Sequence, residues 1–178
     1  MLAGACDAVG WERGQVRVLD IAAGNGVSGE ALAAAGLGER GLYGTDIVPA
    51  ARAAALRDRP GLYEEYLTLD LLALSAGERA HVAALQANAL SCVAPVGVHG
   101  GELPPEALVA AAGLLAPDAL VVYMHDPHHG GADPMTPEAW GAATRAQELA
   151  RHRYVHRYTV NGAPFEMDGV VWRVRRES

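Results

Sequence analysis

The sequence predicts an α/β fold, in which helices flank a largely parallel sheet and an antiparallel hairpin follows at the C-terminal end. Short apolar segments alternate with alanine- and leucine-rich segments over residues 16–124, as in successive strand–helix units. Acidic residues close three of these apolar segments, at Asp20, Asp46 and Asp70. Two alternating segments flank Asn161-Gly162, which is a strong hairpin signal. At 178 residues the chain is expected to form one domain, residues 1–178.

The composition is that of an ordinary globular protein with an acidic balance. Hydrophobic residues make up 51% and charged residues 20%, and the net charge is −7 with fourteen basic residues, all arginine. This balance argues against nucleic acid or an anionic membrane as the main partner. No apolar segment is long enough to span a membrane, and residues 1–7 lack the positive start of a secretory signal, so a cytoplasmic location is expected. Cys6 and Cys92 are expected to be free, reduced thiols.

The first strand–helix unit is the segment around which a ligand site is expected. Residues 16–20 form an apolar strand segment, residues 22–26 are small and glycine-rich, and residues 29–35 have the composition of a helix. A strand, a glycine turn and a helix in this order form the half of a βαβ unit that holds a nucleotide-like ligand on its turn. Glycine is favoured there because a Cβ would block the ligand's approach to the backbone.

Two cofactor classes compete for this turn. The segment Gly24-Asn-Gly-Val-Ser-Gly29 fits the dinucleotide pattern G-x-G-x-x-G, with Asp46 near the spacing expected for a ribose-binding acid. The segment Asp20-x-x-x-Gly24-x-Gly26 instead resembles motif I, D-x-G-x-G-x-G, of class I S-adenosylmethionine-dependent methyltransferases, with Ala22 in place of the first glycine. A pyrophosphate prefers the bare positive end of a helix, so the acid at Asp20 favours the methyltransferase interpretation. The resemblance implies that Asp20 and the backbone at Ala22, Gly24 and Gly26 hold the methionyl part of S-adenosylmethionine.

The next two strands extend the resemblance. A strand is expected to end at Asp46, followed by a helix over Pro49–Asp58, and a third strand over Glu65–Leu69 precedes Asp70. By resemblance, Asp46 takes the ribose hydroxyls, Ile47 lies against the adenine, and Asp70 with Leu71 binds the adenine edge. A helix N-cap is the alternative role for Asp46, and the two roles can coexist. Parallel strands present their carboxyl ends along one edge, so the three acids are expected to gather there.

The second half of the sheet is predicted from residues 75–124. Helices are expected over residues 75–86 and 104–115, and strands over residues 87–94 and 119–124. The strand Ser91-Cys-Val93 and the helix start Pro104-Pro-Glu-Ala107 resemble a group of bacterial methyltransferase-like proteins, which implies that Val93 contacts the cofactor. Asn88 and Asp118 depart from the family pattern, in which an aspartate opens the fourth strand and a Pro-Gly turn precedes the fifth.

The C-terminal part is predicted to close the sheet. A helix is expected over Thr136–His152, followed by an alternating strand from Arg153, a turn at Asn161-Gly162 and a return strand over Phe165–Arg175. Such a hairpin resembles the strand pair that completes the seven-stranded, Rossmann-like class I methyltransferase sheet, and it is foreign to the nicotinamide-binding half-fold. With it, the resemblance runs from Val16 to about Arg176.

Histidines are the candidates for catalysis. Methyl transfer from a sulfonium is an in-line displacement, so the protein must position the nucleophile and accept its proton. His99 and His125 are expected nearest the strand ends, and a solvated loop histidine is the alternative for each. Metal binding is a further alternative for the loop after the fifth strand, and no metal is expected. The ligands it would offer are His125, Asp126, His128, His129 and Asp133.

The predicted activity is S-adenosylmethionine-dependent methylation of a small molecule on oxygen, nitrogen or carbon, with S-adenosylhomocysteine as product. A protein of the same fold that binds the cofactor or serves as a scaffold without transferase activity is the first alternative, and a nicotinamide oxidoreductase is the second. Little sequence precedes the first strand, so the site is expected to be open or closed by another subunit, for example in a homodimer.

Overall fold

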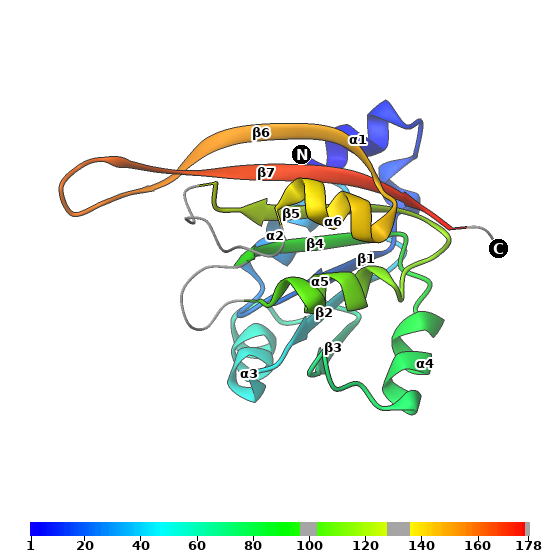
Figure 1. Ribbon diagram of the computed structural model, residues 1–178. Coiled ribbons are helices and arrows are strands. Elements are labelled where there is room, and N and C mark those ends of the chain that lie inside the picture. Colours follow the sequence, from blue (N-terminus) through cyan, green and yellow to red (C-terminus); the bar gives the residue numbers. More distant parts are fainter. Residues whose placement is uncertain (97–102, 128–135, 177–178) are drawn as a thin grey trace.

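The computed structural model describes residues 1–96, 103–127 and 136–176, which form a single seven-stranded sheet in the order β3-β2-β1-β4-β5-β7-β6 (Figure 1). The strands are β1 (Val18–Ile21), β2 (Leu42–Asp46), β3 (Glu65–Thr68), β4 (Ala89–Val96), β5 (Asp118–His125), β6 (Gln147–Tyr158) and β7 (Pro164–Arg175). Strands β3, β2, β1, β4 and β5 are parallel to one another, whereas β7 is antiparallel to both β5 and β6. The predicted α/β fold with a C-terminal antiparallel hairpin is confirmed.

Helices cover both faces of the sheet. They are α1 (Leu2–Ala8), α2 (Val27–Ala34), α3 (Pro49–Asp58), α4 (Ala76–Ala84), α5 (Pro105–Ala112) and α6 (Pro137–Thr144), with a short 3₁₀ helix over Arg13–Gln15. Adjacent residues of β1 point to opposite faces, so Val18 packs in the core under α1, α2 and α3, and Leu19 packs in the core under α4, α5 and α6. The central parallel strands are therefore buried on both sides, which explains their continuous apolar sequences.

Local sequence fixes where several helices begin. Ser75 and Glu78 form a capping box at the start of α4, in which the Ser75 hydroxyl accepts from the Glu78 amide and the Glu78 carboxylate accepts from the Ser75 amide. The Thr136 hydroxyl accepts from the Ala139 amide at the start of α6. Helices α3, α5 and α6 each begin at a proline, whose missing N–H is not needed in the first turn.

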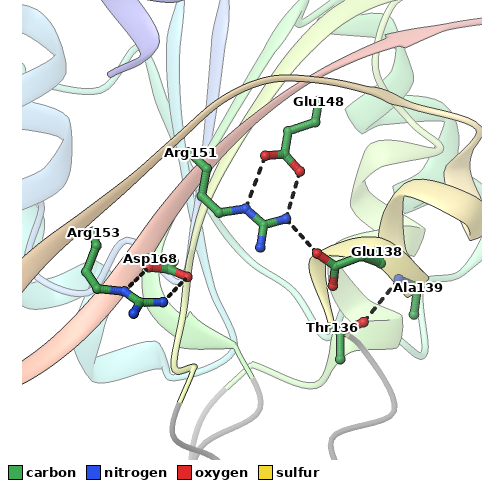
Figure 2. A network of polar contacts seen from close by, with 7 residues as sticks. All are labelled: Thr136, Glu138, Ala139, Glu148, Arg151, Arg153 and Asp168. Carbon is green, nitrogen blue, oxygen red and sulfur yellow. Dashed lines mark hydrogen bonds and ion pairs between the residues drawn. The ribbon is translucent and has the colours of Figure 1, made fainter.

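The helix predicted over residues 136–152 is wrong in its second half. Helix α6 ends at Thr144, Arg145 takes a left-handed conformation with φ of +54°, and β6 begins at Gln147. Residues 147–153 pair with residues 168–173 of β7, so sheet pairing overrides the helix propensity of this alanine-, glutamate- and leucine-rich segment. Arg151 of β6 then reaches Glu138 of α6 and Glu148 of its own strand (Figure 2).

The hairpin extends beyond the rest of the sheet. Pairing between β5 and β7 stops at His125 and Asp168, so residues 164–167 pair only with β6, and the two strands project together (Figure 1). The turn forms at the predicted Asn161-Gly162 step, where Gly162 has φ of +77°. Within the described residues, no helix combines the length and apolar character that crossing a membrane requires.

Candidate cofactor-binding site

A cavity of about 570 Å³ lies at the carboxyl ends of the parallel strands. The turn after β1, the end of β2, the segment after β3 and the start of α5 line it. The lining residues are Ala22, Thr45, Asp46, Ile47, Val48, Leu69, Asp70, Leu71, Leu72, Leu103, Pro104 and Ala107. The structure thus brings together five residues predicted from sequence, Ala22, Asp46, Ile47, Asp70 and Leu71. Its volume is in the range of small-molecule sites.

Asp46 links the glycine turn to the end of β2. Its Oδ2 accepts from the Gly24 amide at 3.0 Å, and its Oδ1 accepts from the Val48 amide at 2.9 Å. Val48, and not Asp46, is the N-cap residue of α3, so the alternative role as an N-cap does not hold. Each carboxylate oxygen keeps a further acceptor position, because an ionised carboxylate offers about four.

Asp70 and the apolar residues around it form the other end of the cavity. Asp70 is exposed, and its Oδ1 accepts from the Leu72 amide at 2.9 Å. Ile47 and Leu72 remain 61% and 51% exposed, which is unusual for large aliphatic side chains unless a ligand or partner covers them. The cavity combines two carboxylates with aliphatic walls, an arrangement that suits a flat, largely apolar group with polar edges.

Asp20 lies beneath the glycine turn. It lines neither this cavity nor a second one that adjoins it at Ala22. Strand β1 continues through it to Ile21, so Asp20 is a fully buried interior residue of the strand. Its Oδ2 accepts from the Ser28 hydroxyl at 2.7 Å and from the Tyr63 hydroxyl at 2.8 Å. Burial raises the pKa of Asp20 to about 6, against the opposing effect of these hydrogen bonds. In this position the acid supports the turn from below.

Two tyrosines that the sequence analysis did not single out complete this support. Tyr63 precedes β3 and donates to Asp20, and Tyr66 of β3 donates to the Gly24 carbonyl at 2.7 Å. Their rings meet edge to face at 5.3 Å. Burial raises the pKa of both hydroxyls, so they remain protonated donors. The sequence feature that could have identified these residues is a pair of tyrosines three residues apart at the start of a short strand.

The backbone of the turn is left-handed at three alternate positions. Ala22, Gly24 and Gly26 have φ values of +51°, +56° and +90°. A Cβ on Gly26 would lie 3.1 Å from the Tyr63 ring, so glycine is required there for space as well as for conformation. Ala22 adopts a conformation that costs a non-glycine residue about 1–2 kcal/mol. The departure from the motif I pattern at Ala22 therefore has a direct structural consequence.

A second cavity of about 520 Å³ adjoins the first at Ala22. Helices α1 and α2 form its sides, and β4 and β5 contribute Ser91, Val93, Val122 and Met124. Val93, predicted to contact the cofactor, lines this second cavity and is 43% exposed.

Of the two predicted catalytic histidines, the structure places His125 at the end of β5 with 8% exposure. Its direct partner across the strand pair is Asp168 of β7. Arg153 of β6 donates to both Asp168 oxygens, at 2.8 and 3.1 Å (Figure 2). These hydrogen bonds hold the pKa of Asp168 below its usual range, and the charges of Arg151 and His125 act in the same direction. His125 thus lies in register with Asp168 and Arg153 across three strands.

The other histidine, His99, lies outside the described residues, as do His128, His129 and Asp133 of the alternative metal site. Over residues 1–96, 103–127 and 136–176, histidine, cysteine and acidic side chains form no group of three or more that could hold a metal ion.

Comparison with solved structures shows the fold. It is the Rossmann-like fold of class I methyltransferases. The N-methyltransferase NodS from Bradyrhizobium japonicum superimposes with a TM-score of 0.62 at 16% identity, over 90% of this chain and 86% of that one. The 1,6-didemethyltoxoflavin-N1-methyltransferase from Burkholderia thailandensis, solved with S-adenosylhomocysteine, superimposes with a TM-score of 0.61 at 16% identity, over 98% of this chain and 77% of that one. A candidate RNA methyltransferase from Pyrococcus horikoshii superimposes with a TM-score of 0.65 at 12% identity, over 98% of this chain and 82% of that one. No protein-family model and no curated protein matches the sequence.

Proposed function

We propose that this protein is an S-adenosylmethionine-dependent methyltransferase that acts on a small-molecule acceptor. One observation carries the proposal: Ala22 of the glycine turn, Asp46 and Asp70 line a single cavity at the strand ends of a class I methyltransferase fold. One of the similar structures is a 1,6-didemethyltoxoflavin-N1-methyltransferase that was solved with 1,6-didemethyltoxoflavin bound, which supports a small acceptor.

The residues of the cavity suit the parts of S-adenosylmethionine. The carboxylate of Asp46 offers its remaining acceptor positions to the two ribose hydroxyls, and that of Asp70 offers one to the exocyclic amino group of adenine. Ile47 and Leu71 provide aliphatic contact for the adenine faces. Ala22 of the turn lines both cavities and is positioned to contact the methionyl part, with Val93 in the second cavity; the predicted cofactor residues Gly24 and Gly26 line neither cavity.

S-adenosylmethionine, when bound, supplies a methyl group on a good, neutral leaving group. The protein's own residues have to orient the acceptor, exclude water and receive the acceptor's proton where the acceptor carries one. His125 is our proposed proton acceptor on the described part of the chain, because it lies at the carboxyl end of β5, on the same edge of the sheet as the cavities, although it lines neither of them. His99 remains the second candidate.

Binding measurements test the proposal. Purified protein is titrated calorimetrically with S-adenosylmethionine, S-adenosylhomocysteine and NAD(H), and the titrations are repeated with Asp70→Asn. This variant keeps an oxygen for the Leu72 amide and loses only the outward-facing carboxylate. We expect micromolar binding of both sulfur compounds and at least tenfold weaker binding by the variant.

The matched control is Asp7→Asn, which changes an exposed carboxylate that is paired with Arg13 and does not line the cavity. Its affinity should equal that of the wild type. Binding of NAD(H) alone would support the oxidoreductase alternative and overturn the proposal. Cofactor binding without methyl transfer to any of a broad panel of acceptors would favour the scaffold alternative.

A further inference from the structure

The second cavity is a groove that runs along helix α2. Val27, Ser28, Ala31, Leu32 and Ala35 line it, and their three- and four-residue spacing places them on one face of the helix. Eight helical residues span about 12 Å. The groove therefore extends from the glycine turn, at Ala22, along the full length of α2 to Leu37.

The opposite wall and the floor of the groove are also small or apolar. Met1, Leu2 and Ala3 of the α1 region form the wall, and Ser91 and Val122 contribute to the floor. Small side chains at Ala3, Ala31, Ala35 and Ser91 explain why space remains between two helices on a sheet face that is otherwise packed. The groove is thus a consequence of particular residues in the chain.

The chemistry of the groove differs from that of the adjoining cavity. No side chain that lines the groove is charged, and only Ser28 and Ser91 carry polar side chains; all of these residues lie within the described chain. The charged group on the lining residues is the α-ammonium of Met1. The Ser28 hydroxyl already donates to Asp20. A cationic ligand would lose its hydration here without gaining a partner, whereas an apolar ligand would cover the exposed side chains of Val27 and Met1, which are 58% and 44% exposed.

We propose that the groove binds the body of the methyl acceptor, and that this acceptor is an elongated, predominantly apolar small molecule without a positive charge. The inference rests on the proposed function, because Ala22 lines both cavities and so places the near end of the groove beside the methionyl part of the cofactor. The acceptor atom lies at this end, near Ala22 and Val93, and the apolar body lies along α2 toward Ala35.

The test uses two ten-carbon probes that differ only in their head group, 1-decanol below its solubility limit and decylammonium below its critical micelle concentration. They are titrated into the full-length protein, with and without S-adenosylhomocysteine. We expect 1-decanol to bind at least tenfold more tightly than decylammonium. In protein labelled with ¹³C at the methionine methyl groups, the Met124 resonance should shift with 1-decanol.

Two matched variants test whether the probe binds in the groove. Ala31→Phe puts a ring in the middle of the groove, and Ala33→Phe puts the same ring on the opposite, exposed face of α2. We expect Ala31→Phe to weaken 1-decanol binding at least tenfold and to leave S-adenosylhomocysteine affinity within twofold, whereas Ala33→Phe changes neither. Both sites are exposed, and equal melting temperatures confirm that both variants fold.

Several results would overturn the inference: no binding of 1-decanol, equal binding of decylammonium, or binding that survives Ala31→Phe. A wild-type dimer that Ala31→Phe converts to a monomer, measured by light scattering, would instead assign the groove to a second copy of the chain. Failure of the proposed function is seen separately, as absent S-adenosylhomocysteine binding in the wild type and both variants.

Discussion

Ala22 holds a left-handed backbone at a position that lines both cavities. A non-glycine residue in this conformation is strained, and such strain is commonly retained at functional sites. The structure shows what sets the conformation: Asp46 binds the Gly24 amide on one side of the turn, and Tyr66 binds the Gly24 carbonyl on the other. The side-chain methyl group of Ala22 is therefore kept at the junction of the two cavities at a cost in stability.

Ala22→Gly should raise the free energy of unfolding by up to about 1 kcal/mol, because the strain disappears while glycine adds some entropy to the unfolded chain. The measurement is denaturant unfolding of the variant and the wild type. Ala33→Gly is the matched control: it makes the same chemical change inside α2 and should lower stability by about 1 kcal/mol. A destabilised Ala22→Gly would show that the left-handed turn is not strained.

Asp20 makes the free energy of unfolding of the protein depend on pH. Its folded-state pKa of about 6 lies above the usual value of 3.8, so the folded protein binds this proton more tightly than the unfolded chain. The contribution of Asp20 to stability is therefore lost as the pH rises from about 4 to 6, with a total of roughly 2–3 kcal/mol for a shift of this size.

Asp20→Asn should accordingly gain stability relative to the wild type as the pH rises through this window, with a constant difference above pH 6. Denaturant unfolding between pH 4 and pH 8 measures it. Asp7→Asn is the control: a hydrogen bond from Arg13 holds the pKa of Asp7 below its usual range, so Asp7 titrates below this window and the variant should differ from wild type by a constant amount above about pH 5. A difference between Asp20→Asn and wild type that does not vary with pH would contradict the account.

Helix α6 and strand β6 illustrate what sequence alone could not predict at the level of elements. The segment after α6 carries good helix formers, and its own periodicity favours continuation to His152. Its strand conformation depends on β7, which follows later in the chain and supplies partners along the segment, with a bulge at Leu149. By contrast, the strand ends at Asp46 and near Asp70, and the turn at Asn161-Gly162, were predictable because local residue types determine them.

The position of α6 depends on close packing with β7. Trp140 of α6 and Trp172 of β7 lie 5.4 Å apart, and a Cβ on Gly141 would be 2.6 Å from the Trp172 ring. Gly141→Ala should therefore lower stability by about 1–3 kcal/mol through overpacking. Gly77→Ala in α4, where a Cβ meets nothing within 4 Å, should be neutral or stabilising. Equal effects of the two variants in thermal unfolding would contradict this explanation.

Across the whole molecule, the topology determines the site. Parallel strands place the ends of β1, β2 and β3 along one edge, so residues far apart in sequence line one cavity, as the spacing of Asp46 and Asp70 predicted. The burial of Asp20 was not predictable, because it depends on Tyr63 reaching it from a segment next to another strand. The groove along α2 was also not predictable, since its small residues leave a space only once α1 lies opposite them.

A crystal structure of the protein with S-adenosylhomocysteine tests the central claim most directly. Our account predicts the ribose hydroxyls at Asp46, the adenine amino group at Asp70 between Ile47 and Leu71, and the homocysteine part at the turn beside Ala22. Asp20 should stay buried beneath that turn, hydrogen-bonded to Ser28 and Tyr63. A ligand bound elsewhere, or an adenine that makes no contact with Asp70, would contradict the account.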